Sequence, residues 1–132
     1  MAELLLIEDH ETLRLVMRAV LESRGHHCTE AASGREALLE LRRKSFDAMV
    51  LDLMLPEVRG IEVIRLAQQQ HPEMPILVTT GRQEIYGAEA LRAGASMVLY
   101  KPFLPREFLE TLQQTLNGFR ETAPDEMARF SA

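Results

Sequence analysis

Four short apolar runs and one short run that mixes polar and apolar residues, residues 27–31, constrain the fold of this chain more than any other feature of its sequence. A stretch of helical periodicity follows each run. The five runs span residues 4–7, 27–31, 48–52, 75–79 and 97–100. Short apolar runs are typical of strands that are buried on both faces of a sheet. Strands that alternate with helices favour a parallel sheet covered on both sides. We therefore predict an α/β domain with five parallel strands.

The segments between these runs predict five helices and the limits of the domain. Apolar residues recur at three- and four-residue spacing in each segment, and the last such pattern ends at Gly118. Right-handed crossovers leave few topologies, among which a doubly wound (βα)5 sheet of flavodoxin-like order 2-1-3-4-5 is the leading candidate. We expect one domain over residues 1–118. Residues 119–132 are expected to be a frayed tail or the start of a linker.

Charge and cysteine content exclude several classes of function. The formal net charge of −5 opposes direct binding to nucleic acid. Cys28 is the only cysteine, which rules out an internal disulfide and argues against a cysteine metal site. No apolar run approaches the roughly 18 residues of a membrane span. The first run starts almost at Met1 and leaves no room for a signal peptide, so we expect a cytoplasmic protein.

Four of the five predicted strands end in side chains that can do chemistry. They are the acidic pair Glu8 and Asp9, then Asp52, Thr79 and Lys101. The carboxyl ends of parallel strands meet at one edge of the sheet, where ligands usually bind. Three carboxylates about 5 Å apart would repel one another by roughly 3 kcal/mol per pair at an effective dielectric of about 20. A divalent cation removes this penalty, and oxygen ligands select Mg²⁺, or else Mn²⁺.

The same residues predict a reaction at phosphorus. A carboxylate attacks phosphorus once the phosphoryl oxygens are neutralised, as in enzymes that form an aspartyl phosphate. Asp52 is the expected nucleophile because it lies at the end of the third strand, which is expected near the middle of the crevice. The metal, the Lys101 ammonium and the Thr79 hydroxyl would each cover one phosphoryl oxygen.

In these residues the chain resembles a bacterial response-regulator receiver domain. The resemblance covers residues 3 to about 117 and rests on the acidic pair at 8–9, Asp52 within the sequence LDLMLP, Gly60, Thr79, and the sequence KPF at 101–103. It implies a magnesium-dependent phosphoacceptor that takes a phosphoryl group onto Asp52 from a histidine kinase or a histidine phosphotransfer protein. Such a domain passes a signal on and is not a turnover enzyme.

The resemblance also implies a role for each site residue. Asp9, Asp52 and the backbone carbonyl of Met54 would hold the metal, and Glu8 would act mainly through metal-bound water. Thr79 and Lys101 would hold the phosphoryl group and report its arrival. The output surface would be the face made by the fourth helix, fifth strand and fifth helix, which would contact an unknown downstream protein or effector domain and is the expected site of any homodimer.

Three positions depart from the pattern of that family. The residue three places before the lysine is Val98, where an aromatic is expected, while Tyr100 directly precedes the lysine. The aromatic part of the family's switch is therefore not expected here. Thr80 stands where the family usually has alanine or glycine. Met54 is a bulky apolar residue close to the acceptor Asp52. We hypothesise that both restrict an attacking water and so prolong the life of the phosphoaspartate.

Other classes of protein share parts of this pattern. A phosphorylation-independent pseudo-receiver adaptor would have the fold without the chemistry, and the intact acids, hydroxyl and lysine argue against it. A doubly wound Mg²⁺-dependent phosphohydrolase would need a second acid two residues after the nucleophile, where this chain has Met54. A flavodoxin-like cofactor protein would need a phosphate-binding loop after the first strand, and that loop is lacking.

Overall fold

A computed structural model describes residues 1–81 and 84–123 of the protein. The elements in chain order are β1 (Glu3–Ile7), α1 (Glu11–Glu22), β2 (His27–Ala31), α2 (Gly34–Arg43), β3 (Ala48–Asp52), α3 (Gly60–Gln70), β4 (Ile76–Thr80), α4 (Glu84–Ala93), β5 (Met97–Tyr100) and α5 (Pro105–Leu116). All neighbouring strands pair in parallel, in the order β2-β1-β3-β4-β5. The predicted fold class and strand order are confirmed.

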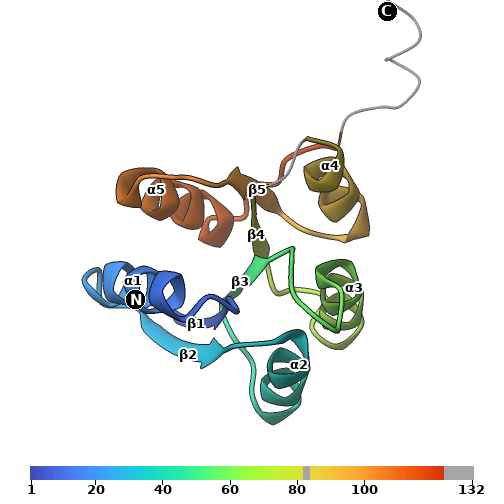
Figure 1. Ribbon diagram of the computed structural model, residues 1–132, viewed down its shortest axis with the longest axis horizontal. Coiled ribbons are helices and arrows are strands. Elements are labelled where there is room, and N and C mark those ends of the chain that lie inside the picture. The colour runs from blue at the N-terminus through green and yellow to red at the C-terminus, as the bar shows by residue number, and fades with distance from the viewer. Residues whose placement is uncertain (82–83, 124–132) are drawn as a thin grey trace, which may run out of the picture.

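The sheet separates two layers of helices (Figure 1). Alternate strand residues build an apolar core on each face of the sheet. On one face, Leu4, Leu6 and Val50 pack with residues of α1 and α5. On the other face, Leu5 and Leu51 pack with residues of α2, α3 and α4. Strand side chains point to opposite faces in turn, which explains why runs buried on both sides have no polar alternation.

Polar residues at the strand-to-helix junctions start the helices. The His10 ring nitrogen Nδ1 accepts a hydrogen bond from the Leu13 amide at the start of α1. At the start of α2, the Ser33 hydroxyl accepts one from the Glu36 amide. These contacts satisfy backbone donors that have no partner within a helix. They also fix where the loops that follow β1 and β2 end.

The observed structure differs from the sequence-based expectations at two places. The fourth strand extends one residue further than expected, so that Thr80 is a strand residue paired with Tyr100. The segment after α5 does not fray immediately, because the Glu121 amide donates a hydrogen bond to the Ser96 carbonyl. The rest of the expected tail, residues 124–132, lies outside the described residues. Within residues 1–81 and 84–123, no helix is long and apolar enough to span a bilayer.

His26 is expected to make stability depend on pH. Its Nδ1 accepts a hydrogen bond from the Ala2 amide (3.1 Å), and burial lowers the pKa of His26 below its usual value of 6.5. A lowered folded-state pKa contributes stability that is present above pH 6.5 and lost as the pH falls below it. We expect the free energy of unfolding to fall more steeply between pH 7 and pH 5 in the wild type than in His26→Gln. Urea titrations across this range would measure the difference, and parallel pH profiles would contradict it.

Candidate functional site

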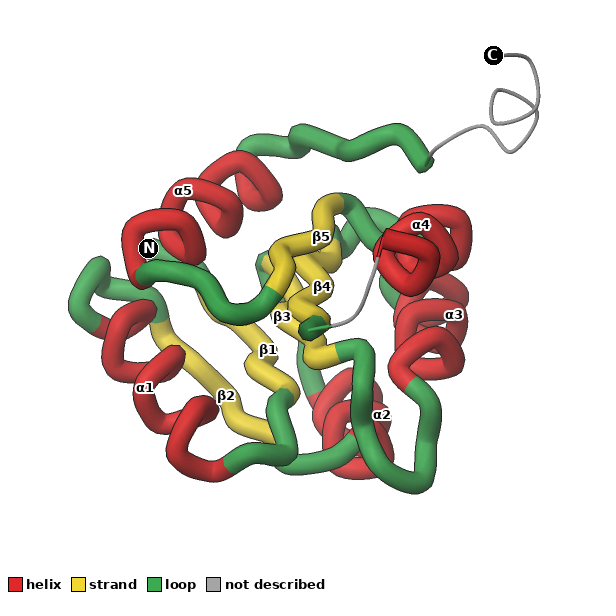
Figure 2. The backbone as a smooth tube through the Cα atoms, turned by 45° about the horizontal axis from the view of Figure 1, so that its top comes forward, coloured by secondary structure: helices red, strands yellow, loops and turns green. Residues whose placement is uncertain are grey.

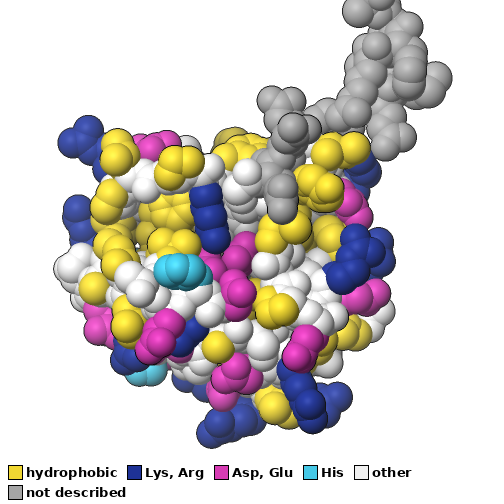
Figure 3. All heavy atoms as spheres, viewed as in Figure 1, with side chains coloured by type: hydrophobic (Ala, Val, Ile, Leu, Met, Phe, Trp, Pro, Cys, Tyr) yellow, Lys and Arg dark blue, Asp and Glu magenta, His cyan; other side chains and the backbone are white. Residues whose placement is uncertain are grey.

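The predicted site residues gather at the carboxyl ends of the strands, on the side of the sheet covered by α1 and α5. Looking onto these ends, acidic side chains lie together at the centre of the molecular surface with a basic side chain beside them (Figure 3). Glu8 and Asp9 follow β1, Asp52 ends β3, Thr79 lies near the end of β4 and Lys101 follows β5. The parallel sheet brings these residues together although up to 93 positions separate them along the chain.

Asp52 is held in one orientation by contacts to both of its carboxylate oxygens. Its residue is only 5% exposed. Its Oδ1 accepts a hydrogen bond from the Met54 amide (3.0 Å), and its Oδ2 lies 3.3 Å from the Lys101 ammonium. In the pairing of β3 with β4, its partner is Thr79. The carboxylate therefore lies between a fixed cation and a hydroxyl-bearing strand.

Glu8 is almost completely buried, with 1% of its surface exposed. Its Oε1 accepts a hydrogen bond from the Lys101 ammonium (2.8 Å) and its Oε2 accepts one from the His10 amide (3.1 Å). Burial, together with the nearby charge of Asp52, raises the pKa of Glu8, although the hydrogen bond from Lys101 opposes that shift. The hydrogen bond from Lys101 therefore offsets only part of the cost of burying the charge of Glu8.

The loop that carries the acidic pair is braced by a residue that sequence reasoning missed. Arg14 donates a hydrogen bond to the Glu8 carbonyl oxygen (2.8 Å) and another to the Glu30 carboxylate on β2 (3.0 Å). The side chain of Arg14 is largely buried. It therefore ties the main chain between β1 and α1 to the neighbouring strand. From the sequence, Arg14 is one of several charged residues of α1. Only the structure shows that its side chain contacts Glu8 and Glu30.

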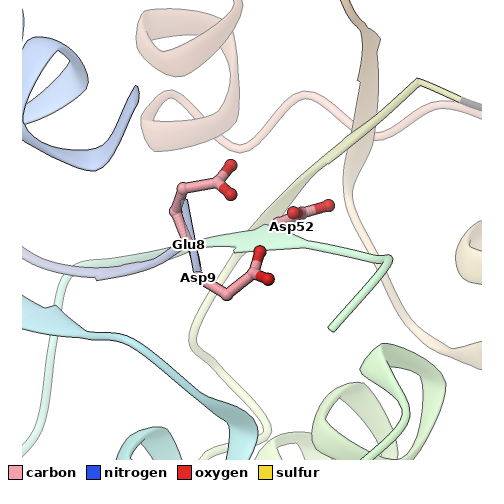
Figure 4. A group of neighbouring side chains, drawn as sticks. All are labelled: Glu8, Asp9 and Asp52. Carbon is pink, nitrogen blue, oxygen red and sulfur yellow. The ribbon is translucent and has the colours of Figure 1, made fainter. Parts of the chain in front are cut away.

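Glu8, Asp9 and Asp52 form a cluster that fits a divalent cation. One carboxylate oxygen from each residue lies within 4.8 Å of the others, and the three carboxylates lie close together (Figure 4). Three carboxylates and the one ammonium of Lys101 leave a net charge of −2. Hard oxygen donors with such an excess of negative charge suit a small divalent ion. Asp9 is exposed, so one side of the cluster is open to solvent.

Lys101 pairs with two acids at once. Burial tends to lower its pKa, but the hydrogen bond to Glu8 and the charge of Asp52 outweigh burial, so the pKa of Lys101 is raised. The lysine therefore stays protonated throughout the physiological range. The side chain of Lys101 is about one quarter exposed, whereas the carboxylates of Glu8 and Asp52 are buried. This cation remains available to an anionic group that approaches Asp52.

Thr79 is fully buried, and its hydroxyl oxygen has no hydrogen-bonding partner among residues 1–81 and 84–123. A buried polar group without a partner destabilises a protein by about 1–3 kcal/mol, so such groups call for an explanation. An anionic oxygen bound beside Asp52 would accept the hydrogen bond that Thr79 can donate. The unpartnered hydroxyl therefore supports a ligand-binding role for this strand end.

The residues that depart from the receiver pattern lie beside the candidate site or between the sheet and α4. Val98 is buried among the apolar residues between the sheet and α4. Tyr100 is 40% exposed and its ring packs on Gly87 of α4, where a Cβ would lie 2.2 Å from the tyrosine hydroxyl oxygen. Met54 is 44% exposed beside Asp52. The Met54 amide contacts Asp52 directly, and the expected role of the Met54 carbonyl stays a prediction.

Replacing Glu8 by glutamine is expected to raise the stability of the metal-free protein and to weaken its binding of Mg²⁺. A carboxyl whose folded-state pKa is raised loses stabilising free energy as the pH rises above its unfolded value. At pH 7 the charged Glu8 therefore opposes folding, and Glu8→Gln should unfold at a temperature a few degrees higher without divalent ions. The same variant should gain less stability from 10 mM Mg²⁺ than the wild type does. Thermal unfolding with and without Mg²⁺ measures both; a lower midpoint in metal-free buffer would refute the first expectation.

The fold and the site together define a class: doubly wound domains with an acidic cation pocket and a lysine at the strand ends. Comparison with known proteins identifies the family. Residues 4–113 match the model of the response regulator receiver domain. The response regulator MprA of Mycolicibacterium vanbaalenii is 37% identical over 130 residues, which are 98% of this chain and 55% of MprA.

Solved structures agree with this family. A two-component response regulator of the LuxR family from Aurantimonas has a TM-score of 0.85 and 33% identity, with 96% of this chain and 93% of that chain covered. The chemotaxis response regulator CheY4 of Vibrio cholerae has a TM-score of 0.82 and 31% identity, with 87% and 98% covered. The chain therefore belongs to the response regulator receiver domain family. It spans about half the length of MprA, the curated relative described above.

Proposed function

We propose that this domain accepts a phosphoryl group on Asp52 from the phosphohistidine of a histidine kinase or a histidine phosphotransfer protein. The observation that carries the proposal is the pairing of one Lys101 ammonium with both Glu8 and Asp52, beside the unpartnered hydroxyl of Thr79. A cation and a hydrogen-bond donor thus flank a buried carboxylate on the side where a phosphoryl group would approach. A structural ion pair alone would not need the buried hydroxyl.

Mg²⁺ fits the acid cluster, and Mn²⁺ shares its preference for oxygen ligands. We propose that Asp9, Asp52 and the Met54 carbonyl hold the ion and that Glu8 acts through its bound water. When bound, the ion supplies positive charge that neutralises phosphoryl oxygens. The location of Glu8 supports the indirect role, because both of its carboxylate oxygens already accept hydrogen bonds from the protein.

In the proposed transfer, a carboxylate oxygen of Asp52 forms a bond to phosphorus while the bond from phosphorus to the imidazole nitrogen breaks. The electron pair of that bond leaves with the imidazole. Lys101 remains protonated and pairs with one phosphoryl oxygen, and Thr79 donates its hydroxyl hydrogen to another. The Met54 amide, which donates to Oδ1 of Asp52, keeps the carboxylate oriented throughout.

An apolar recess beside the site supports a protein as the phosphoryl donor. It has a volume of about 440 Å³ and is lined by Leu13, Lys101, Pro102 and Phe103. Hydrophobic side chains also gather next to the acidic centre on this face of the molecule (Figure 3). A helix that presents a phosphohistidine over Asp52 could bury apolar side chains in this recess.

Four further expectations remain predictions. They are the end of the domain at residue 118, the cytoplasmic location, the downstream partner, and dimerisation through α4, β5 and α5.

We also propose that the domain carries a signal without multiple turnover. Asp52 has Met54 at the position where a phosphohydrolase of doubly wound fold would carry its acid/base carboxylate. Within residues 1–81 and 84–123, one group of three or more side chains could bind a metal ion, and it consists of Glu8, Asp9 and Asp52. The pseudo-receiver adaptor is not favoured, because the acids, hydroxyl and lysine meet in one place.

Intact mass after incubation with acetyl phosphate tests the proposed function. We expect a single phosphoryl adduct per chain that requires Mg²⁺. Beryllium fluoride with Mg²⁺ should form a stable complex at the same site. Release of many phosphates per chain would favour the hydrolase, and the absence of any adduct would favour the adaptor.

Thr80→Ala is expected to shorten the life of the phosphoaspartate several-fold. Thr80 is fully buried directly after Thr79, and a smaller side chain there would open a path for water toward the acceptor. Each tenfold change in rate corresponds to about 1.4 kcal/mol in the barrier. Loss of the adduct from purified phosphorylated protein, followed by mass, measures the rate. Equal or slower loss in the variant would sink the hypothesis.

A further inference from the structure

The loop between β1 and α1 carries Asp9, the exposed member of the acidic cluster. Helix α1 runs beside β2, and this loop lies at the carboxyl end of β1 and β2 (Figure 2). Asp52, by contrast, is buried, and its two carboxylate oxygens are held by the Met54 amide and by Lys101. Because the side chain of Asp9 is open to solvent, its position depends on what holds the main chain around it.

Arg14 binds the carbonyl oxygen on each side of Asp9. Its guanidinium Nη1 donates a hydrogen bond to the Glu8 carbonyl oxygen (2.8 Å), and its backbone amide donates one to the His10 carbonyl oxygen (2.9 Å). The second bond belongs to the first turn of α1, so it forms whatever side chain stands at position 14. The side chain of Arg14 therefore has a separate effect, which is to orient the peptide unit that joins Glu8 to Asp9.

The guanidinium of Arg14 is itself held by β2. Its Nε donates a hydrogen bond to Oε1 of Glu30 (3.0 Å), and Arg18 donates one to Oε2 of the same residue. Burial tends to raise the pKa of Glu30, but the hydrogen bonds from Arg18 and Arg14 lower it below the usual value of 4.5. Glu30 is therefore an anion at neutral pH. One planar guanidinium thus joins this anion to the main chain beside Asp9.

We propose that Arg14 is a positioning residue that makes the acidic cluster select Mg²⁺ over Ca²⁺. This inference rests on the metal site of the proposed function. Mg²⁺ requires a nearly ideal octahedron of ligands at short distances, whereas Ca²⁺ accepts a variable geometry. A carboxylate that is fixed before the ion binds therefore favours Mg²⁺. If Asp9 can shift, the site loses more affinity for Mg²⁺ than for Ca²⁺.

The charge of Arg14 acts in the opposite direction to this positioning effect. Its guanidinium binds the loop that carries two of the three carboxylates, where a positive charge repels a cation. Loss of the charge alone would therefore strengthen the binding of both ions. Arg14→Lys keeps the charge but replaces a planar group with several donors by a single ammonium. This variant changes the geometry of the loop without changing the net charge.

Calorimetric titration of the whole chain with Mg²⁺, and separately with Ca²⁺, tests the proposal. We expect Arg14→Lys to bind Mg²⁺ about tenfold more weakly than the wild type, as for other residues that support a metal ligand. The affinity for Ca²⁺ should change much less. Arg18→Lys is the matched control, because Arg18 lies on the same helix and also binds Glu30, but its other partner is Glu22. The control should leave both affinities unchanged.

Glu30→Ala is a second variant, which removes the partner of Arg14 and leaves the residues of α1 unchanged. It should lower the preference for Mg²⁺ by a smaller factor, and it should add little to Arg14→Lys because the two side chains act as a unit. Unfolding midpoints in metal-free buffer check that each variant folds.

Two results would overturn the role of Arg14 alone. One is an unchanged affinity for Mg²⁺ in Arg14→Lys, and the other is an equal loss of affinity for Mg²⁺ and Ca²⁺, which would indicate a change in charge or stability. A wild type that binds no Mg²⁺ would overturn the proposed metal site as well, so this failure is distinguishable from the other two.

Discussion

Asp52→Asn is expected to lower phosphoryl uptake from acetyl phosphate by roughly a hundredfold or more. An amide is not a nucleophile toward phosphorus, and the variant also removes one of the three carboxylates that attract the cation. The variant should fold, because asparagine has nearly the shape of aspartate and its Oδ1 can still accept the Met54 amide. Intact mass in Mg²⁺ over time measures uptake.

Asp47→Asn is the matched control for this experiment. Asp47 lies just before β3, at the opposite end of the strand from Asp52, where its carboxylate accepts the Glu3 amide. The control loses the same charge but should take up phosphate at the wild-type rate. Undiminished uptake in Asp52→Asn would move the acceptor to another residue and overturn the proposed function. Equal loss in both variants would indicate damage to the fold rather than to the site.

Gly60→Ala is expected to reduce the free energy of unfolding by about 3 kcal/mol, at the upper end of overpacking effects. A Cβ at this position would lie 2.4 Å from the Leu53 carbonyl oxygen and 2.8 Å from its Cα. Both are backbone atoms that follow directly after Asp52, so the main chain itself has to move. Because whole domains are stable by only about 5–15 kcal/mol, urea denaturation should resolve the change easily.

Gly25→Ala separates backbone crowding at Gly60 from the general effect of losing a glycine. Gly25 has φ of +83° and open space around its Cα, so alanine there should destabilise by only about 1 kcal/mol through the left-handed conformation. In Gly60→Ala, phosphoryl uptake should also slow beyond what the lost stability explains, because Leu53 shifts beside the acceptor. A change no larger than that of Gly25→Ala would show that the Leu53 loop yields freely.

Val98 and Tyr100, which depart from the receiver pattern, limit how a movement at Thr79 can reach the face made by α4 and β5. Val98 has no ring that could move into space beside Thr79, and Tyr100 packs on Gly87 of α4 instead. Any movement of Thr79 would therefore reach the α4 and β5 face through the paired strands. In that ladder Thr79 pairs with Leu99, and the Lys101 amide donates to the Thr80 carbonyl. The same β5 strand binds Glu121 on its outer edge.

Sequence patterns were sufficient to predict the fold and to predict that the candidate site residues lie close together. The periodicity of Leu13, Val16 and Met17 predicts a helix, and the run before Asp52 predicts a buried strand, because both signals are local. Parallel strands share one carboxyl edge, so the reactive residues that follow them were expected to meet there. That expectation needed no contact information.

Only the tertiary structure decided which groups pair with one another. Three such contacts join segments that the sequence does not pair. Lys101 bridges Glu8 and Asp52. Arg14 binds the Glu8 carbonyl, and Glu121 binds the edge of β5. Spacing cannot predict such contacts, since a side chain's partner depends on the twist of the sheet and the packing of neighbouring helices. Glu121 shows this most clearly: it follows the last helical pattern of the sequence, and it contacts the edge of β5 and not an apolar core.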